Sequence, residues 1–428
     1  MRWSNWTGDQ RCAPAAYDEP ASEPELIDAI GRARAHGLRV RAVGTGHSFN
    51  DAALTDGHMI SLRRLKRVID ADRASGLVEV EAGISLHELG PALADRGLAM
   101  ENLGDVDAQS LAGALATATH GTGAGFRNLS AQVAALRLVS ADGSAVTCSA
   151  DEDPELFRAA RVGLGALGVV SSVTLRCVPL YTLRRVDEQR PLGEVLDRLE
   201  ELADAHERFE LFTFPYSGLA LTRTTERTGG APRVRRGEAV RDVLLENAAL
   251  GAFCRAGRAL PRLVPAIDRA VGRLATGGER VYLSYRIYAN PRLVHFTEME
   301  YAVPREAGAE VVRAVLDLVE RRRLPILFPL EVRFAAGDDG FLSPAHDRDS
   351  CYVAVHQYRG MEFETYFRAV EAIMDEHGGR PHWGKRHYQS AATLEPKYPE
   401  WGRFAGMRDR LDPDRLFEND YTRRVLGP

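Results

Sequence analysis

The first 180 residues alternate between the apolar spacing of helices and that of strands. Ser22 and Glu25 form a capping-box pattern at the start of an amphipathic helix, and Gly37 ends it. Residues 38–43 then alternate apolar and polar side chains, which indicates a strand. The same patterns predict strands at 59–62, 67–71, 77–81, 135–140, 145–148 and 169–178, and helices at 86–96 and 154–161.

Beyond residue 181 the elements become longer, which indicates a second domain. Helices are expected at 192–206, within 240–275, at 306–322 and at 363–377, and strands at 209–215, 281–289, 296–303, 326–335 and 351–358. These elements alternate around a mainly antiparallel sheet. The sequence therefore predicts an α+β protein.

A glycine-rich loop that contains a histidine follows the strand at 38–43. It consists of Val43, Gly44, Thr45, Gly46, His47 and Ser48. A second loop of small residues includes Ser110, Gly113, Thr117, Thr119, His120 and Gly121. Glycines let backbone N–H groups approach a phosphate closely. One such loop is equally compatible with a plain turn, but two in one domain favour a cofactor site.

Residues 163–168 match the dinucleotide fingerprint GxGxxG. That fingerprint needs a strand before it and a helix after it. Here the predicted helix at 154–161 precedes the glycines, and the predicted strand at 169–178 follows them. We therefore expect these glycines to let the backbone pass close to a cofactor or to neighbouring loops, rather than to bind NAD.

The composition fits an enzyme with proper hydrophobic cores, since 45% of its 428 residues are hydrophobic and 27% are charged. The net charge of -5 argues against nucleic-acid and anionic-membrane partners, and the short basic run at 233–236 is expected to be a solvated loop. No stretch resembles a membrane span or a signal peptide, so we expect a cytoplasmic protein. The five cysteines lack metal-binding spacing and are expected to be buried thiols, and no metal site is expected.

Ionisable residues occur at period-two spacing on three otherwise apolar strands. The pairs that share a face are Glu331 with Arg333, His356 with Tyr358, and Glu298 with Glu300. Such groups are costly to bury unless they are paired or functional. A structural ion pair on a wet sheet face is one interpretation of Glu331 and Arg333, and a reactive surface is the other.

Lysine is rare in this chain. Only three of the 55 basic residues are lysines, namely Lys66, Lys385 and Lys397. Lys385 ends the sequence Arg-Pro-His-Trp-Gly-Lys, which begins at Arg380. Because arginine is used almost everywhere else, this lysine is a candidate functional residue.

Together these features resemble the FAD-dependent sugar-lactone and alditol oxidases of the vanillyl-alcohol-oxidase type. The two glycine loops resemble their FAD-binding, PCMH-type domain. Residues 331–334, 337–339, 342–344, 348–352 and 378–383 are similar, in order and spacing, to the C-terminal half of L-gulono-1,4-lactone oxidases and of bacterial dehydrogenases of that family. The resemblance implies an FAD-binding domain at 1–180 and a substrate or cap domain at 181–380, with a mainly antiparallel sheet covered by helices. It also implies that a C-terminal segment at 381–428 returns to the flavin site.

The resemblance also implies which residues bind FAD, and that FAD is attached covalently through His47. These residues are Val43, Gly44, Thr45, Gly46, His47, Ser48, Gly104, Asp105, Ser110, Gly113, Thr117, Thr119, His120, Gly121, Val170 and Lys385. The implied catalytic residues are Glu331, Arg333, Lys385 and His356, with Glu298 and Tyr358 contacting the substrate. Arg333 and Lys385 would offset negative charge on the reduced flavin, and either Glu331 or His356 would take the proton.

Three functions stay open. The first is oxidation of a sugar 1,4-lactone, such as L-gulono-1,4-lactone, to a keto-lactone that becomes ascorbate. The second is oxidation of alditols at terminal hydroxyls, and the third is flavin binding without catalysis. Asp105 favours lactones because the alditol oxidases have a serine at the matching position. Electrons are expected to pass to dioxygen, for which Gly104 leaves room, or to a carrier such as cytochrome c or a quinone.

Overall fold

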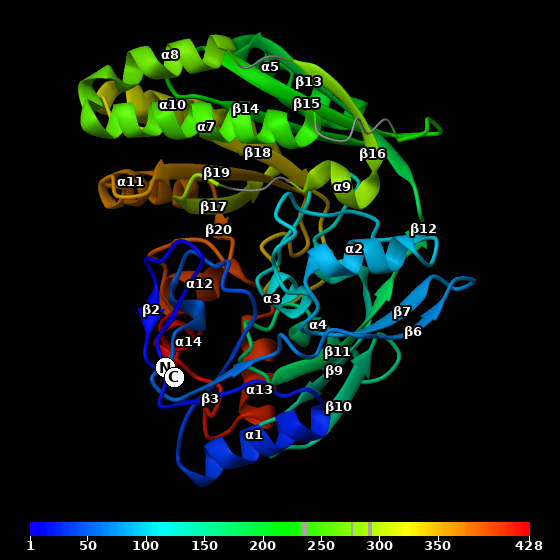
Figure 1. The fold of residues 1–428 in the computed structure, drawn as a ribbon. Helices are drawn as coiled ribbons and strands as arrows, with labels where there is room; N and C mark the ends of the chain where they lie inside the picture. Colours follow the sequence, from blue (N-terminus) through cyan, green and yellow to red (C-terminus); the bar gives the residue numbers. More distant parts are fainter. Residues whose placement is uncertain (233–237, 275–276, 290–292) are drawn as a thin grey trace.

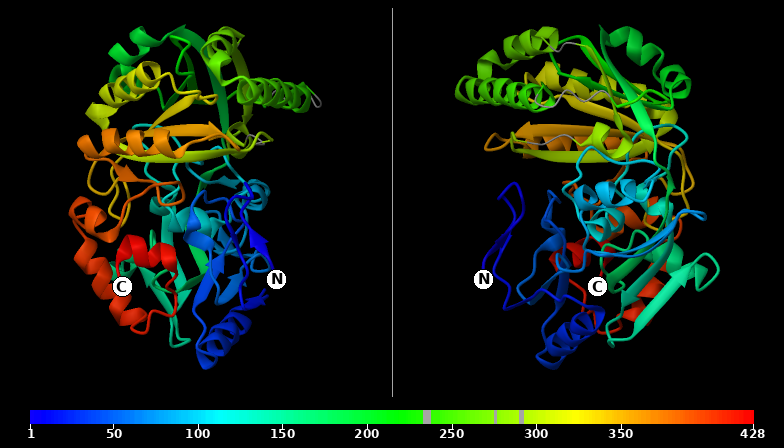
Figure 2. Two further views of the ribbon diagram at one scale, coloured as in Figure 1. Left: turned by 90° about the vertical axis from the view of Figure 1, so that its left-hand side faces the viewer. Right: turned by 45° about the vertical axis from the view of Figure 1, so that its right-hand side comes forward.

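The computed structural model describes residues 1–232, 238–274, 277–289 and 293–428. Figure 1 shows two regions, one above the other: the N-terminal elements in the lower half and a broad sheet with its helices in the upper half. The C-terminal helices return to the lower half, where both ends of the chain lie (Figures 1 and 2). This arrangement agrees with the predicted α+β organisation.

The first domain contains a parallel and an antiparallel sheet. The parallel sheet has the order β3 (Ala16–Asp18), β5 (His58–Ser61) and β4 (Val40–Val43). The antiparallel sheet has the order β10 (Ala145–Ser149), β9 (Val133–Val139), β11 (Val169–Arg176), β7 (Leu77–Glu81) and β6 (Val68–Asp72). Two short pairs are β1 (Trp3–Ser4) with β2 (Arg11–Cys12), and β8 (Leu98–Ala99) with β12 (Val178–Pro179).

Helices cover both sheets of the first domain. The hydroxyl of Ser22 accepts a hydrogen bond from the backbone N–H of Glu25 and so caps α1 (Glu23–Ala35), whose buried face includes Leu26 and Ile30. That face packs on the parallel sheet. The main core of the domain is formed with α2 (Leu86–Ala94), α3 (Leu111–Ala116) and α4 (Pro154–Ala160). The strand that leads into the first glycine loop is therefore packed against the buried face of α1.

The second domain is built on one eight-stranded antiparallel sheet. Its order is β16 (Gly278–Leu283), β13 (Thr182–Pro191), β15 (Leu219–Thr228), β14 (Arg208–Thr213), β18 (Leu330–Ala335), β19 (Ser350–Tyr358), β17 (Phe296–Pro304) and β20 (Arg380–Pro381). Its largest core is shared with α5 (Leu192–Asp197), α6 (Leu199–Ala205), α10 (Gly308–Arg322) and α11 (Glu364–Glu376). A smaller apolar cluster joins α7 (Glu238–Ala259) and α8 (Val264–Leu274) to Phe296 and Phe328. We call this domain the cap.

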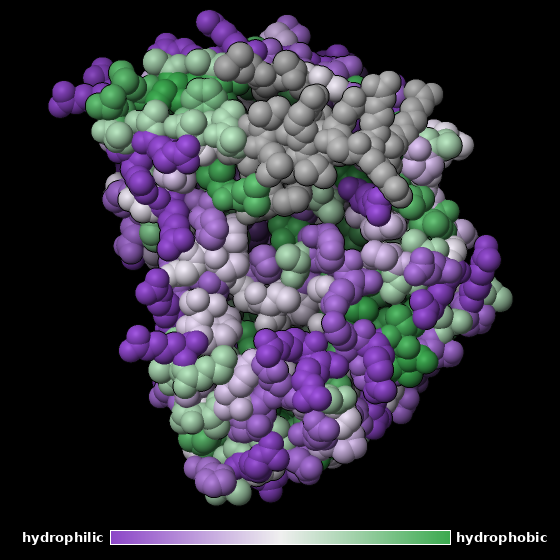
Figure 3. All heavy atoms as spheres, viewed as in Figure 1, coloured by the Kyte–Doolittle hydropathy of each residue, from purple (hydrophilic) through white to green (hydrophobic). Residues whose placement is uncertain are grey.

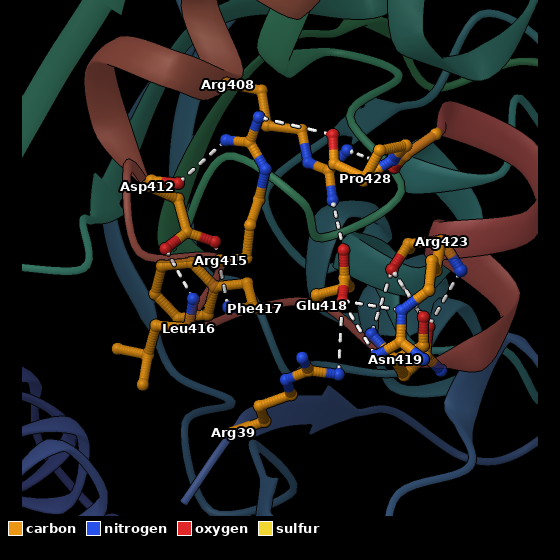
Figure 4. A network of polar contacts seen from close by, with 12 residues as sticks. Arg39, Arg408, Asp412, Arg415, Leu416, Phe417, Glu418, Asn419, Arg423 and Pro428 are labelled. Carbon is orange, nitrogen blue, oxygen red and sulfur yellow. Dashed lines mark hydrogen bonds and ion pairs between the residues drawn. The ribbon is translucent and has the colours of Figure 1, made fainter. Parts of the chain in front are cut away.

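A cluster of ion pairs around the buried Glu418 links the C-terminal segment to the first domain (Figure 4). It contains α12 (Ala391–Leu394), α13 (Trp401–Leu411) and α14 (Asp420–Leu426). The buried carboxylate of Glu418 lies 3.1 Å from Arg39, 3.2 Å from Arg408 and 2.8 Å from Arg423. Because Arg39 immediately precedes β4, this cluster ties the end of the chain to the strand beneath the first glycine loop.

Three predicted elements differ from the structure. The strand expected at 281–289 ends at Leu283, because α9 (Ser284–Tyr288) turns Tyr285 and Tyr288 onto the core of the first domain. The helix expected at 192–206 is two helices, since Arg198 leaves the helical conformation. The strand expected at 326–335 begins at Leu330, and the basic run at 233–236 lies outside the described residues.

The face of the molecule seen in Figure 3 is mostly polar. On the face seen in Figure 3, hydrophobic residues gather over α8. Among the helices that the structure describes, none combines the length and apolarity needed to cross a lipid bilayer. The five cysteines form no disulfides. Cys148, Cys254 and Cys351 are buried as predicted, whereas Cys12 and Cys177 are only partly buried.

Candidate active site

A cavity of about 430 Å³ lies where the first domain, the cap sheet and the turn at 382–385 meet. The first domain contributes residues 41–49, 105–117 and 163–170 to its walls, and the cap contributes side chains of β17, β18 and β19. The predicted site residues that line it are Val43, Gly44, Thr45, Gly46, His47, Ser48, Asp105, Ser110, Gly113, Thr117, Val170, Glu298, Glu331, Arg333, His356 and Lys385. Residues separated by more than 300 positions in the sequence thus meet around one space.

Five predicted site residues, Gly104, Thr119, His120, Gly121 and Tyr358, are not among the residues that line this cavity. A Cβ on Gly104 would lie 3.1 Å from the backbone oxygen of His120, so there is little room for a side chain at this position. Whether Gly104 controls the access of dioxygen stays a prediction. Tyr358 stacks on Phe328 near the outer helices of the cap instead.

The two glycine loops touch each other and fit a phosphate-bearing cofactor. A Cβ on Gly44 would clash with the hydroxyl of Ser110, which caps α3. Gly46 has a φ of 73°, a left-handed conformation that favours glycine. The loops therefore form a cradle whose walls are backbone rather than side chains, as the close approach of a phosphate requires.

The glycines at 163–168 form a further wall of the same cavity. As predicted, a helix (α4) precedes them and a strand (β11) follows. Gly168 has a φ of 147°, and a Cβ there would lie 2.6 Å from Leu138. The prediction that this motif is no Rossmann fingerprint is confirmed, and its glycines serve close packing beside the cavity.

His47 lies half-buried at the edge of the cavity. Its ring stacks on the indole of Trp6, with centroids 5.6 Å apart. The N-terminal segment holds this loop, because the backbone N–H of Trp6 donates to the Gly46 carbonyl and the Asn5 side chain donates to the Ser48 carbonyl. Burial, and then the charge of Lys385, lowers the pKa of His47 below its ordinary value. The imidazole is therefore neutral at neutral pH and retains a nucleophilic lone pair.

Arg333 is the centre of the charged wall that the cap presents. It forms a close ion pair with Glu331 on the same strand, and its Nε donates to Glu210 at 2.9 Å. Asp105 of the first domain lies 3.3 Å from its Nη2, so the cluster spans the boundary between the domains. Burial by itself would lower the pKa of Arg333, but Glu331 and Glu210 raise it above its ordinary value. The guanidinium is a permanent, fixed cation.

Further charges alternate behind Arg333. Glu210 pairs with Arg223 at 2.9 Å, Arg223 pairs with Asp187 at 2.8 Å, and Asp187 pairs with Arg185 at 2.6 Å. These residues come from β14, which pairs with β18, and from β15 and β13, the next two strands of the sheet. This ladder was not predicted from the sequence. Its signal there is the recurrence of acidic and basic residues at period two, as in Arg185 with Asp187.

A second charged group surrounds Glu298. Its carboxylate lies 2.6 Å from Nζ of Lys385 and 3.6 Å from Nε2 of His356. Burial would raise the pKa of Glu298, but Lys385 and His356 lower it to about 2. The turn that presents Lys385 is fixed by the first glycine loop, since the side chain of Asn50 donates to the backbone oxygens of Trp383 and Lys385.

Nδ1 of His356 lies 2.9 Å from the backbone oxygen of Pro329, an acceptor, so Nδ1 carries a proton. In the neutral ring Nε2 then has a free lone pair, and this nitrogen is the one that faces Glu298. His356 is thus placed to accept a proton at Nε2, with a carboxylate beside it to stabilise the imidazolium.

His120, Glu300 and His382 form a buried cluster next to the cavity. Possible ligand atoms of these three lie within 4.8 Å of one another, the one such group in the described parts of the chain. Nε2 of His120 already lies 3.2 Å from Glu300, and Nδ1 of His382 accepts from the N–H of Gly384. Burial lowers the pKa of His382 to about 3, so its ring is neutral. These contacts account for the cluster as a protein network that joins the second glycine loop to the cap.

Two family matches together cover most of the chain. The model of the "FAD binding domain" matches residues 14–149, and the model of "D-arabinono-1,4-lactone oxidase" matches residues 173–425. The chain belongs to the D-arabinono-1,4-lactone oxidase family. As predicted, it is an FAD-dependent oxidoreductase of the sugar-lactone oxidase group.

Relatives and solved structures agree with this assignment. The chain is 56% identical to an L-gulono-1,4-lactone dehydrogenase from Mycobacterium tuberculosis, over all of this chain and 99% of that protein. It is 35% identical to the L-gulonolactone oxidase of Mus musculus, over all of this chain and 98% of that one. A crystal structure of cholesterol oxidase from B. sterolicum superposes with a TM-score of 0.82 at 18% identity, covering 100% and 96% of the two chains. The predicted vanillyl-alcohol-oxidase-type fold is confirmed.

Proposed function

We propose that this enzyme oxidises a sugar 1,4-lactone, L-gulono-1,4-lactone or a close aldonolactone, to the keto-lactone that gives an ascorbate-type product. The observation that carries the proposal is the wall formed by Glu331, Arg333, His356 and Lys385 opposite the two glycine loops. The names of the relatives at 56% and 35% identity support this substrate class.

Each residue of the wall has a role in removing a proton and a hydride from the alcohol. FAD, when bound, supplies the acceptor of the hydride. Nε2 of His356 takes the hydroxyl proton, and Glu298 stabilises the resulting imidazolium. Glu331, held by Arg333, orients the hydroxyls of the sugar. Arg333 and Lys385 supply fixed positive charge where negative charge develops.

FAD is proposed to be held by the glycine loops and attached through His47. The neutral, half-buried imidazole at the cavity edge supports this attachment. Acid-denatured wild-type protein should retain its yellow colour in the pellet, whereas His47→Ala should release flavin to the supernatant. Complete release from the wild type would contradict the covalent link but not FAD binding.

Electrons are proposed to pass onward to dioxygen or to a carrier such as cytochrome c or a quinone. We also propose a cytoplasmic location, which the absence of disulfides among the five cysteines supports.

A substrate panel tests the proposal most simply. Purified protein under nitrogen is mixed with L-gulono-1,4-lactone, D-arabinono-1,4-lactone or C5 and C6 alditols, and flavin absorbance is followed. Lactones should bleach the flavin faster than any alditol, and air, cytochrome c or a quinone is then added to identify the acceptor. Faster bleaching by alditols would establish the alternative substrate class, and no bleaching by either would indicate a noncatalytic flavoprotein.

A further inference from the structure

Arg41 is a buried cation at the cavity wall that forms no ion pair with the residues the structure describes. The residue is 6% exposed, and it lies on β4, three positions before the first glycine of the loop. Its Nε donates to the backbone oxygen of Ala52 at 2.6 Å and its Nη2 to that of Leu164 at 2.7 Å. Nη1 has no hydrogen-bond partner among the described residues.

Other buried arginines near the site are arranged differently. Arg333, Arg223 and Arg185 each pair with a carboxylate of the cap. The hydrogen bonds of Arg41 go only to backbone oxygens. Burial lowers the pKa of Arg41 to about 10, which still leaves it charged at neutral pH. A buried charge without a partner is costly, so an anion bound close to this guanidinium would stabilise it.

No acidic side chain of the described chain supplies that anion. Asp51 is the one carboxylate whose charge acts appreciably on Arg41, and it is bound by Arg424 at 2.8 Å. On the cavity side, a Cβ on Gly165 would lie 3.5 Å from Nη1, and this position has none. Nη1 is therefore buried next to the backbone of Gly165, which itself lines the cavity, and no side chain of that position covers it.

We propose that Arg41 is the counter-ion of the diphosphate of FAD. The diphosphate is the anionic part of this cofactor, and a guanidinium matches phosphate oxygens in geometry as well as charge. Because Arg41 and the glycine loop belong to one continuous segment, the same strand supplies both the backbone cradle and the compensating charge. Arg41 thus makes the cavity select a dinucleotide over an uncharged flavin.

Ligand binding to flavin-free protein tests this role. The flavin is removed from the His47→Ala protein, or from the wild type if its flavin proves noncovalent, and FAD, ADP and adenosine are titrated by calorimetry at several salt concentrations. Arg41→Met should lower the affinity for FAD and for ADP by about 10- to 100-fold, as expected for the loss of one charge-assisted interaction with phosphate. The affinity for adenosine should fall by less than about 2-fold. Arg41→Lys should recover part of the loss, and the salt dependence of ADP binding should become shallower in Arg41→Met.

Arg380→Met is the matched control, because Arg380 is also buried and bonded only to backbone oxygens but does not line the cavity. It should lower the melting temperature without changing ADP affinity. Unchanged ADP affinity in Arg41→Met would overturn the proposal. So would an equal loss of ADP and adenosine affinity, which would make Arg41 a structural or adenine-binding residue.

Discussion

The two walls of the cavity differ in how their positively charged side chains are paired. On the cap side, Arg333 and Lys385 are each held by carboxylates of the protein itself. On the first-domain side, the loops present mainly glycine backbone and small hydroxyl groups beside Asp105 and Asp107, and Arg41 pairs with no carboxylate among the described residues. The cations of the cap wall are thus neutralised by carboxylates of the protein, whereas the buried cation of the first-domain wall is complementary to an anionic ligand.

This difference separates catalysis from cofactor recognition. Fixed, paired charges need no reorganisation when negative charge develops in a transition state. An unpaired buried cation, in contrast, is stabilised most strongly when an anionic ligand binds beside it. Substitutions on the cap side should therefore change rates, and substitutions on the first-domain side should change FAD binding.

The largest effect is expected from Glu331→Gln. Glu331 and Glu210 both bind Arg333, but only Glu331 lines the cavity. Glu331→Gln should slow anaerobic flavin reduction by about 100- to 1,000-fold, as for the loss of one preorganised polar group in an active site. The matched variant Glu210→Gln should lower the melting temperature while slowing reduction by less than about 10-fold. Equal rates in the two variants would mean that the pair with Arg333 is only structural.

A smaller effect is expected where the two glycine loops touch. In Gly44→Ala the new methyl group displaces the Ser110 hydroxyl and with it the cap of α3, which is worth about 1 kcal/mol. In a His47→Ala background, where flavin binding is reversible, the affinity for FAD should fall by about 10-fold, as measured by flavin fluorescence. Adding Ser110→Gly should restore part of the affinity in the double variant. A double variant no better than Gly44→Ala would show that another contact of Gly44 matters.

The sequence predicts the functional strands better than it predicts their partners. Glu331 with Arg333, and Glu298 with Glu300, are readable because period-two spacing places each pair on one face of a strand. That His356 faces Glu298 could not be read in this way, because it depends on the pairing of β19 with β17. Glu210 could not be predicted as a partner of Arg333, because that contact depends on β14 lying beside β18, more than 100 residues away. Pairing of distant strands is a tertiary property that local patterns do not contain.

The same limit explains why only part of the cofactor site in the first domain could be predicted. The loop around His47 could be predicted from its glycines, whereas Arg41 looks like an ordinary polar position in an alternating strand. Its burial depends on Ala52 and on Leu164, which lies 123 positions further along the chain. The helix α9 was missed for a related reason, since its tyrosines are fixed by packing on the other domain.

The smallest effect is a pH dependence that belongs to the cap ladder. Burial would raise the pKa of Asp187, but Arg185 and Arg223 lower it to about 2. A carboxylate with a depressed pKa stabilises the fold above its ordinary pKa, and this contribution is lost as the pH falls from about 4 to about 2. The contribution is about 2 kcal/mol, from the relation of 1.4 kcal/mol per pKa unit.

Urea unfolding between pH 7 and pH 2 measures how much the ionised Asp187 contributes to the free energy of unfolding. Asp187→Asn should be less stable than the wild type at pH 7, and the two proteins should converge as the pH approaches 2. Parallel stability curves over that range would show that the ladder does not hold Asp187 ionised.

The most direct test of the division between the two walls measures FAD affinity and the rate of anaerobic reduction by lactone in the same two variants. Both variants carry His47→Ala, so that flavin binding is reversible. Glu331→Gln should keep the FAD dissociation constant within about 2-fold and lose most of the reduction rate at saturating FAD. Arg41→Met should weaken FAD binding by at least about 10-fold and, at saturating FAD, reduce within about 3-fold of its parent. If Glu331→Gln loses FAD affinity, or if Arg41→Met stays slow when saturated, the two walls do not divide these tasks and the account is wrong.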